Sequence, residues 1–375
     1  MVPKYVQIKE YLKAEALKPE AITSMPSVRT LMRRFSVAMA TVNQALIELE
    51  HENVIIRQQG RGIVAARMPQ NPEVPDAAQN AASIFFAYPD YPSEQLWRLE
   101  FITEQYAKQS GFQVISYKMQ PDTTVRAITE AAARYPNCRE VLIIPTPDRY
   151  SHEELEILGR QSVPVVLLDS QSYYEDMPEN LYIVSHEPEL SGRLMAECLL
   201  QHGHERIGYV RNEPQSDYGI RKQNAFVKTL RRNGAVIPAS HIFSETIRPW
   251  ENSLNAARQI TAKNLDNIRK QKLSALVYTS GVGAVAAIPI LVEGGFAVPD
   301  DISLISEGES TWLEYSNPPL SAVRPHYDGM CKRAMEIAEG KFLDEHFFFC
   351  EQEIIERKSI KTVQNNKSTK KGKSQ

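Results

Sequence analysis

Cysteine is scarce in this chain of 375 residues, and the four that occur, Cys138, Cys198, Cys331 and Cys350, are far apart. Their spacing fits neither a disulfide framework nor a set of metal ligands, so we expect a reducing cytoplasm, no metal and no cofactor. Long hydrophobic runs are also missing. No 18 consecutive apolar residues occur, and the N-terminal residues lack the apolar core of a signal peptide. The sequence therefore predicts neither a secreted domain stabilised by disulfide bonds nor a membrane-spanning segment.

Catalytic motifs are lacking as well, since the chain has no Gly-x-Ser-x-Gly elbow and no phosphate-binding loop. GVGAVA (281–286) has the form of a dinucleotide-binding fingerprint, but it lies late in the chain, whereas such motifs open the first βαβ unit. His202 and His204 in QHGHER are two residues apart, which favours a turn at a helix end over a metal pair. We therefore predict a protein that is not an enzyme.

The length of 375 residues predicts two or three domains, and the hydrophobic fraction of 42% is enough to form their cores. The net charge of -3 is unevenly distributed. Residues 1–68 carry ten Lys/Arg against six Asp/Glu, and the tail from Lys358 carries six lysines and no acid, so the stretch between them is acidic. A basic head on an acidic body indicates that only the head meets a polyanion.

Residues 1–68 have the pattern of a winged helix-turn-helix. Ser27 is expected to cap a short second helix, and a third helix is expected over about 38–49. Two short strands, 54–57 and 63–66, flank a glycine-rich tip that can approach phosphate closely. The first helix is indicated by apolar residues spaced three and four apart, namely Tyr5, Ile8, Tyr11 and Leu12.

This head resembles the DNA-binding domain of GntR-type transcription regulators. The resemblance implies that Ser27, Arg29 and Thr41 hold phosphates and that the third helix enters the major groove. Gly60 and Arg61, at the tip of the wing, are expected to contact the DNA backbone. The family's motifs occur in order as Tyr5/Ile8/Leu12, Pro26/Ser27/Arg29/Leu31, Thr41/Val42/Ala45/Leu46/Leu49 and Arg57/Gly60/Gly62.

Departures from the family pattern change the expected base contacts. Ala38-Met39 stand where the family has Ser-Arg, and Asn43 stands where it has an arginine. Arginine usually binds guanine, whereas asparagine and glutamine prefer adenine. We therefore expect few guanine contacts, with Asn43, Gln44 and either Ala38 or Met39 at the bases. The alternative for Met39 is packing inside the domain.

Two further segments bound the rest of the chain. Residues 69–82 hold three prolines and almost no large apolar side chain, which predicts a linker. Residues 358–375 are polar and basic, which predicts a disordered tail.

Residues 83–357 alternate between strand and helix patterns, which predicts an α/β fold with parallel sheets covered by helices on both faces. The segment is too long for one such sheet, so we expect two lobes with a ligand cleft outside the carboxyl ends of the strands. Strands are expected at 83–88, 111–117, 140–145, 163–169, 181–185, 206–210, 240–244, 275–280 and 302–306.

This body resembles the effector domain of LacI/GalR-type regulators, which is built like a periplasmic sugar-binding protein with three crossovers between two lobes. A GntR-type head on such a body is the arrangement of arabinose-repressor-like regulators. It implies a homodimer that binds a two-fold double-stranded DNA operator and senses a sugar-like effector. The resemblance rests on HGHERIGYV (202–210), Arg221 with the AFVKTLRRNG helix, VPDDISLIS (298–306) and PPLSAVRPHYDGMCKRAMEI (318–337).

The resemblance also implies ligand-binding residues. Arg221, assigned to the family pattern Arg-x-x-Gly-Phe, is expected to donate hydrogen bonds to sugar hydroxyls. Trp250 is expected to pack against a sugar ring, with a core position as the alternative. Asp90, Tyr91 and Asp148 follow strands at the expected edge of the cleft.

In the family, two aspartates that follow strands bind the sugar, and this chain has other residues at both positions. Ser280-Gly281 follow one strand, and Glu307 and Glu309 follow another. We expect Ser280, Glu307 and Glu309 to take over the ligand contacts. The alternatives are a body that has lost ligand binding and only dimerises, and an α/β enzyme with a DNA-binding head. The sequence thus predicts a DNA-binding transcription regulator, a repressor, under the control of a small sugar-like ligand.

Overall fold

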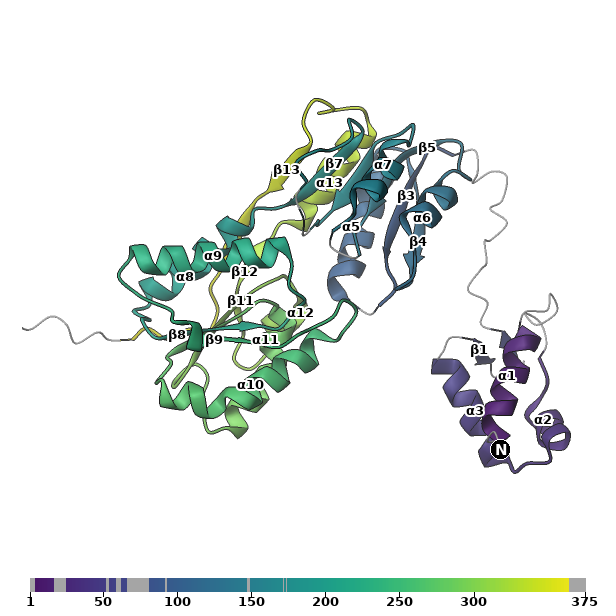
Figure 1. The fold of residues 1–375 in the computed structure, drawn as a ribbon, viewed down its shortest axis with the longest axis horizontal. Coiled ribbons are helices and arrows are strands. Elements are labelled where there is room, and N and C mark those ends of the chain that lie inside the picture. Colours follow the sequence, from purple (N-terminus) through teal and green to yellow (C-terminus); the bar gives the residue numbers. More distant parts are fainter. Residues whose placement is uncertain are drawn as a thin grey trace, which may run out of the picture. The chain divides into compact units, whose positions relative to one another are not determined.

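The computed structural model describes residues 4–16, 25–51, 54–58, 62–65, 81–91, 93–146, 149–170, 172 and 174–363. The chain divides into two compact units, Met1–Ala78 and Gln79–Gln375 (Figure 1). Most of the predicted linker, residues 69–80, lies outside the described residues. In the described ranges, no helix combines the length and the apolar character that crossing a membrane requires.

The first unit is the predicted winged helix-turn-helix. Its helices are α1 (Lys4–Ala16), α2 (Val28–Phe35) and α3 (Met39–His51), and an antiparallel hairpin of β1 (Ile55–Gln58) and β2 (Gly62–Ala65) follows. The apolar side chains that repeat three and four apart in the sequence meet in one core, which contains Ile8, Leu12, Leu31, Val42, Ala45, Leu46, Leu49, Ile55 and Ile63.

Local chemistry sets both ends of α2. The hydroxyl of Ser27 accepts a hydrogen bond from the backbone N–H of Thr30 at 3.3 Å, so the predicted N-cap is confirmed. Ser36 has a left-handed backbone with φ of 52°, and its N–H donates to the carbonyl of Met32. This turn ends α2 and redirects the chain into α3.

The second unit consists of two lobes (Figure 1). Lobe 1 has a six-stranded parallel sheet in the order β13-β7-β6-β5-β3-β4. Its helices cover both faces, with α5 and α13 on one side and α6 and α7 on the other. Its elements are β3 (Ser83–Pro89), α5 (Glu94–Gln109), β4 (Gln113–Met119), α6 (Val125–Ala132), β5 (Cys138–Ile143), α7 (His152–Gly159), β6 (Val165–Leu168), β7 (Leu181–His186), α13 (Tyr327–Ala338) and β13 (Phe347–Cys350).

Lobe 2 repeats this plan in the strand order β14-β12-β11-β10-β8-β9, and only β14 runs antiparallel to its neighbour. Helices α8 and α9 cover one face, and α10 and α11 cover the other. Its elements are α8 (Pro188–Gln201), β8 (Ile207–Arg211), α9 (Asp217–Arg232), β9 (Ile242–Ser244), α10 (Ser253–Lys270), β10 (Ala275–Tyr278), α11 (Gly281–Glu293), β11 (Ser303–Glu307), α12 (Thr311–Tyr315), β12 (Ser321–Pro325) and β14 (Gln352–Ile355).

The chain passes between the lobes at 186–188, 325–327 and 350–352, as the resemblance implied. The nine predicted strands are all present, with ends shifted by a few residues. Three strands, β12, β13 and β14, were not predicted individually. β13 and β14 lie at the edges of their sheets, and β12 lies between β14 and β11.

Disorder was predicted from residue 358, which is too early in the chain. Residues 358–363 pack on lobe 2, where Ser359 is fully buried and its hydroxyl donates to the carbonyl of Leu304 at 2.7 Å. The backbone N–H of Ser321 donates to the same hydroxyl at 2.8 Å. These hydrogen bonds hold the segment against the sheet despite its polar composition. Residues 364–375 lie outside the described residues.

Candidate functional site

The head carries a surface that suits duplex DNA. Arg29, Thr30, Arg33 and Arg34 are exposed on α2, and the Ser27 hydroxyl that caps this helix is exposed beside them. Arg33 and Arg34 were not predicted, although they repeat on the outer face of a short amphipathic helix. Cationic and hydroxyl side chains are the usual donors to phosphate oxygens.

The exposed face of α3 holds the residues expected at the bases. Met39 is 56% exposed, so the alternative in which it packs inside the domain is wrong. Ala38 and Gln44 are exposed, and Thr41 and Asn43 are half-buried. Ile47 adds an exposed apolar side chain that the sequence analysis missed. Gly60 and Arg61, predicted at the wing, lie outside the described residues.

A cleft of about 560 Å³ lies between the two lobes of the second unit. Tyr91, Asp169 and His186 line it from the ends of lobe 1 strands, and Ser280 and Glu307 line it from the ends of lobe 2 strands. This position, outside the carboxyl ends of parallel strands, is the one that the fold favours for a ligand.

A buried ion pair lies in this cleft. The Lys222 ammonium donates to the carboxylate of Glu307, and their side chains are only 4% and 11% exposed. The Tyr218 hydroxyl donates to the same carboxylate at 2.5 Å. Burial alone would raise the pKa of Glu307, but the charge and hydrogen bond of Lys222 and the Tyr218 hydrogen bond hold it below 4.5. Burial lowers the pKa of Lys222, and Glu307 outweighs that effect, so both groups are charged.

Arg221 does not occupy the position predicted for it. It is not among the residues that line the cleft, and its guanidinium pairs with both oxygens of Glu189 at 2.7 and 3.0 Å. Lys222 stands four residues before the buried Phe226, as the arginine does in the family pattern Arg-x-x-Gly-Phe. The sequence assignment was therefore displaced by one residue, which on a helix rotates the side chain by about 100°.

Of the other described residues predicted to bind the ligand ahead of β10, only Tyr91 lines the cleft. Tyr91 lines the cleft, and its ring meets the ring of Trp250 edge-on with centroids 5.4 Å apart. Trp250 is half-buried, lies outside the lining and has a left-handed backbone with φ of 72°. Asp90 is also outside the lining and accepts a hydrogen bond from Gln120 at 3.0 Å. Asp148 lies outside the described residues.

Ser280, Glu307 and Glu309 all line the cleft, as predicted from their places after strands. The Ser280 hydroxyl is also committed to its own helix, because it accepts a hydrogen bond from the N–H of Gly283 and so caps α11. Glu309 pairs with Arg98 of lobe 1 at 2.8 Å. Of these three side chains, Glu309 thus reaches across to the opposite lobe.

A second contact across the cleft centres on Glu94, at the start of α5. Its carboxylate accepts hydrogen bonds from the backbone N–H of Thr311 at 2.8 Å and from the hydroxyls of Thr311 and Ser310. Burial alone would raise the pKa of Glu94, but the hydrogen bonds from Ser310 and Thr311 outweigh it and lower the pKa. Sequence reasoning missed Glu94 and Arg98, because their partners in the other lobe lie more than 200 residues away.

Polar groups also gather on the lobe 1 side of the cleft. The Gln95 amide donates to Asp169 at 2.5 Å, and Nδ1 of His186 lies 3.4 Å from the same carboxylate. The His186 ring meets Tyr327 edge-on at 5.9 Å between centroids. The cleft therefore combines carboxylates, an amide and aromatic faces, which is the chemistry that suits hydroxyl groups and C–H faces of a ligand.

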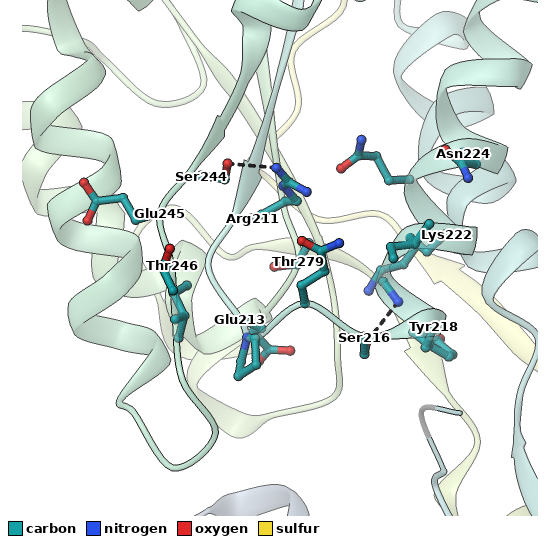
Figure 2. A pocket seen from close by; sticks show the side chains of 16 residues that line it. Arg211, Glu213, Ser216, Tyr218, Lys222, Asn224, Ser244, Glu245, Thr246 and Thr279 are labelled. Atoms are coloured by element: carbon teal, nitrogen blue, oxygen red, sulfur yellow. Dashed lines mark hydrogen bonds between the residues drawn. The ribbon is translucent and has the colours of Figure 1, made fainter. Parts of the chain in front are cut away.

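A second cavity of about 610 Å³ opens in lobe 2 (Figure 2). It shares Glu213, Tyr218, Lys222 and Thr279 with the cleft, so the two spaces adjoin. Arg211 extends into it and donates to the hydroxyl of Ser244 at 2.8 Å (Figure 2).

Packing explains the glycines of GVGAVA. A Cβ atom on Gly283 would come within 2.1 Å of the Asn212 amide, and one on Gly281 would come within 2.8 Å of Leu313. The Asn212 carbonyl oxygen accepts hydrogen bonds from the N–H groups of Thr279 and Ser280 at 3.1 and 3.3 Å. The glycines thus let the helix start lie close to its neighbours, which accounts for the motif without a dinucleotide.

Comparisons with known proteins agree with both parts of the fold. Residues 4–64 match the family described as bacterial regulatory proteins, gntR family, and residues 196–360 match the periplasmic binding protein-like domain. The chain is similar to the arabinose metabolism transcriptional repressor of Geobacillus stearothermophilus, with 21% identity over 90% of each chain.

Two solved structures share the fold of the body. A LacI-family regulatory protein from Chloroflexus aggregans has a TM-score of 0.63 and 18% identity, and the match covers 74% of this chain and 98% of that one. The lac repressor dimer bound to operator and an anti-inducer has the same TM-score and identity, over 78% of this chain and all of the other.

The fold and the matches define a DNA-binding transcription regulator with a two-lobed sensor domain. More narrowly, the chain joins a GntR-type head to a periplasmic binding protein-like domain, which confirms the predicted combination of a winged head and a two-lobed body.

Proposed function

We propose that this chain is a cytoplasmic repressor, without enzymatic activity, that binds a two-fold operator as a homodimer and is controlled by a neutral, sugar-like ligand in the cleft. The observation that carries the proposal is that one chain combines the basic face of α2 with a cleft lined by polar and aromatic side chains from both lobes.

The exposed residues of the head support duplex binding. Arg29, Arg33 and Arg34 on α2 supply positive charge for phosphates, and α3 offers Asn43 and Gln44 for base edges. Ser27 and Thr41 add hydroxyl donors at the starts of these helices. Phosphate contacts would fix the position of the head, and the amide side chains would favour adenine in the operator.

The charges in the cleft narrow the class of ligand. Lys222 is the single lysine or arginine among the described lining residues, and it is already paired with Glu307. Added phosphate or carboxylate groups would meet the surrounding negative charge, so the cleft favours neutral ligands that offer hydroxyl groups. The carboxylates that line it are Glu94, Asp169, Glu213, Glu307 and Glu309.

Contacts between the lobes offer a route for control. Glu94 bonds to Ser310 and Thr311, and Arg98 pairs with Glu309, so the lobes are joined beside the cleft. A ligand that contacts both lobes would stabilise this closed arrangement over an open one. Only such a difference in affinity between two conformations can change operator binding.

An exposed apolar surface supports the homodimer. Trp97 and Phe101 are one turn apart on α5 and are 61% and 62% exposed, and Trp312 and Tyr315 on α12 are 66% and 77% exposed. Trp97 and Trp312 both line the cleft, so the two helices lie near each other. Large aromatic side chains on neighbouring helices are typical of a protein interface.

One alternative is a DNA-binding dimer whose body has lost ligand binding. The observation that favours it is the internal pair of Lys222 and Glu307, because each group already satisfies the other. The two functions differ in a measurable way, since only a sensor would couple a small molecule to operator affinity.

The test has two stages, both on the full-length chain. A duplex operator is first selected from a randomised library, and its affinity is measured by fluorescence anisotropy at fixed salt. Melting temperatures are then measured with pentoses, hexoses and their phosphate esters. A ligand at 100 times its dissociation constant should stabilise the fold by about 2.7 kcal/mol.

We expect at least one neutral sugar, and not its phosphate ester, to raise the melting temperature and to change operator affinity at least fivefold. Stabilisation by phosphate esters alone would overturn the proposed ligand class. Operator affinity that stays constant with every stabilising sugar would overturn the sensor function and favour the ligand-free alternative.

A further inference from the structure

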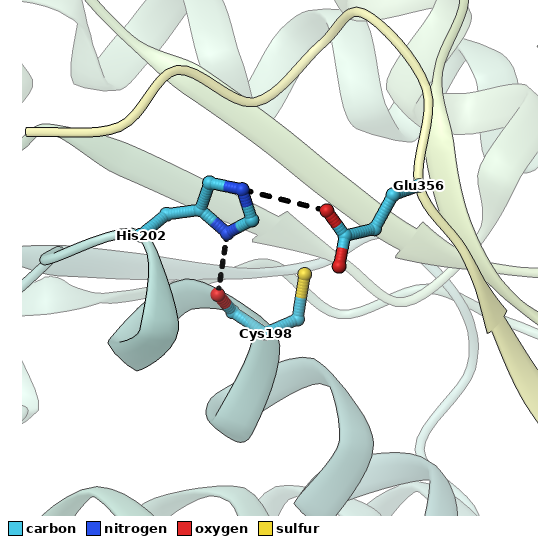
Figure 3. Close-up of side chains that lie close together, drawn as sticks. All are labelled: Cys198, His202 and Glu356. Atoms are coloured by element: carbon cyan, nitrogen blue, oxygen red, sulfur yellow. Dashed lines mark hydrogen bonds and ion pairs between the residues drawn. The ribbon is translucent and has the colours of Figure 1, made fainter.

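Three side chains with metal-binding atoms meet at the C-terminal end of α8, in lobe 2 (Figure 3). Cys198 and His202 are four residues apart along the chain, which places them one helical turn apart on the same side of α8. Glu356 reaches them from the residue that follows β14. The ligand atoms of all three lie within 4.8 Å of one another.

The turn predicted at QHGHER is present, and it separates the two histidines. His202 is the C-cap of α8, and Gly203 continues the chain with φ of 78°. His204 then turns to Ser274, whose hydroxyl lies 2.9 Å from Nδ1. The partners of His202 are therefore Cys198 and Glu356 rather than the neighbouring histidine.

Hydrogen bonding fixes the tautomer of His202. Nδ1 lies 2.9 Å from the backbone carbonyl oxygen of Cys198, which can only accept, so Nδ1 carries the proton. In the neutral ring Nε2 then has a lone pair, and it lies 3.4 Å from a carboxylate oxygen of Glu356 (Figure 3). Two such acceptors face each other favourably only when a proton or a metal cation lies between them. In metal-binding histidines, one ring nitrogen commonly donates a hydrogen bond that orients the other ring nitrogen towards the metal.

The thiol of Cys198 completes the cluster. Its residue is 3% exposed, and Figure 3 shows the sulfur directed at the Glu356 carboxylate. A catalytic cysteine would need a ring nitrogen to take its proton, and both nitrogens of His202 are directed elsewhere. The arrangement therefore suits metal ligation better than nucleophilic catalysis.

We propose that Cys198, His202 and Glu356 are three ligands of one thiophilic divalent cation of the Zn²⁺ class. Sulfur, imidazole nitrogen and carboxylate oxygen together are a ligand set that Zn²⁺ prefers, with bonds of about 2.0–2.3 Å. Tetrahedral bonds of that length place ligand atoms about 3.3–3.8 Å apart, which agrees with the 3.4 Å between His202 and Glu356. Binding releases the thiol proton to solvent, because the metal-bound sulfur is a thiolate.

The location assigns the ion a structural role. α8 starts where the chain first enters lobe 2, and Glu356 follows the strand that enters it last. The ion joins these two segments, and the carbonyl of His202 also accepts a hydrogen bond from the N–H of Val363 at 2.8 Å. Glu356 is exposed, so water can supply the fourth ligand.

The test uses full-length protein that has been treated with a chelator. Cobalt(II) is titrated first, because a thiolate–cobalt bond gives a charge-transfer absorption band, and Zn²⁺ is then titrated against a chromophoric chelator. We expect one equivalent of metal per chain, with the cobalt band absent in Cys198→Ser and the Zn²⁺ affinity at least tenfold lower in His202→Ala and Glu356→Gln.

Cys138→Ser is the matched control, because it removes a partly buried thiol from lobe 1 and should keep the band. Circular dichroism checks the fold of each variant, and Glu356→Gln keeps the size of an exposed side chain and should fold normally. A wild type that binds no more metal than Cys198→Ser overturns the proposal. Loss of the band in Cys138→Ser, or undiminished Zn²⁺ affinity in Glu356→Gln, overturns the assignment of the ligands.

Discussion

At the scale of single residues, the stability of the cleft depends most on the buried ion pair of Lys222 and Glu307. Each is buried and charged, and each is compensated mainly by the other. Removal of one partner leaves an uncompensated charge away from water, whereas the neighbouring pair of Arg221 and Glu189 is 39% and 40% exposed. Lys222 is therefore expected to contribute far more than the adjacent Arg221 to the free energy of unfolding.

Lys222→Met is expected to reduce the free energy of unfolding by about 3–5 kcal/mol at pH 7, because Glu307 loses its partner. Arg221→Met, the matched control, is expected to cost about 0–1 kcal/mol, because water already screens its pair. Urea denaturation followed by circular dichroism measures both. Equal losses for the two variants would contradict the placement of Lys222 in the cleft.

The pH dependence of this pair has a definite sign. The pKa of Glu307 is below 4.5 in the fold, so the stability that the pair contributes is present above pH 4.5 and is lost as pH falls through the lowered pKa. In Lys222→Met, burial without the lysine raises the pKa of Glu307, so the deficit should shrink as the solution is acidified from pH 7 and should be smallest below pH 4.5. A deficit that stays constant from pH 7 to pH 3 would contradict this account.

Glu140 has the opposite environment. It is fully buried in β5, and neither carboxylate oxygen has a hydrogen-bond partner among the residues that the structure describes. Burial raises its pKa well above 4.5. The folded state keeps the carboxyl neutral while the unfolded state ionises, so stability falls as pH rises from 4.5 towards the folded pKa.

Glu140→Met, which removes the carboxyl at similar volume, is expected to raise the free energy of unfolding by about 1–3 kcal/mol at pH 7 and by less at pH 4. Denaturation at both pH values measures the difference. The exposed Glu130→Met, in the same lobe, serves as the control and should show little pH-dependent change. A Glu140→Met variant that is less stable than wild type at pH 7 would contradict the argument.

At the scale of elements, we expect α2 to contact mainly the phosphates of DNA and α3 to contact mainly the bases. α2 presents Arg29 near its capped start and Arg33 and Arg34 in its last turn, whereas α3 presents amide and apolar side chains. Phosphate contacts release counterions and set the salt dependence of binding, while base contacts set the sequence preference. The two helices should therefore respond differently to substitution.

Arg29→Ala is expected to weaken binding to all duplexes and to reduce the slope of log K against log salt by about 1. Gln44→Ala is expected to leave that slope unchanged and to reduce discrimination at one operator position by about 1–3 kcal/mol. Anisotropy titrations at several salt concentrations measure both effects. Arg134→Ala, an exposed change in lobe 1, is the control. An unchanged slope for Arg29→Ala would remove this residue from the phosphate contacts.

At the scale of the whole molecule, the exposed aromatic side chains of α5 and α12 are the strongest sign of assembly. A dimer would bury them, and two heads on one dimer would bind two half-sites together. Loss of the dimer should therefore appear in both mass and operator affinity.

Phe101→Glu is expected to shift the chain towards the monomer and to weaken operator binding at least tenfold, because a charge would be buried at the interface. Light scattering after size-exclusion chromatography measures the mass. Val236→Glu, at a residue that is 66% exposed outside the aromatic surface, is the control. A Phe101→Glu variant that stays dimeric would place the interface elsewhere.

Much of this molecule could be derived from its sequence, because the relevant signals are local. The spacing of Ile8 and Leu12, the cap at Ser27 and the apolar run at 83–88 each act within one helix turn or one strand. Such patterns indicate the winged head and the alternating α/β body without knowledge of any distant contact.

Tertiary structure alone decided which side chains meet. It placed Lys222 rather than Arg221 in the cleft, joined Glu94 to Thr311 across the lobes, and brought Cys198 to Glu356. The spacing to Phe226 would have favoured Lys222 in the sequence, but only the fold shows that the roughly 100° between adjacent helical residues puts Lys222 in the cleft and Arg221 outside it. Contacts between distant segments depend on how whole sheets and helices pack, and they leave no pattern in the local sequence, so only the folded chain defines the site.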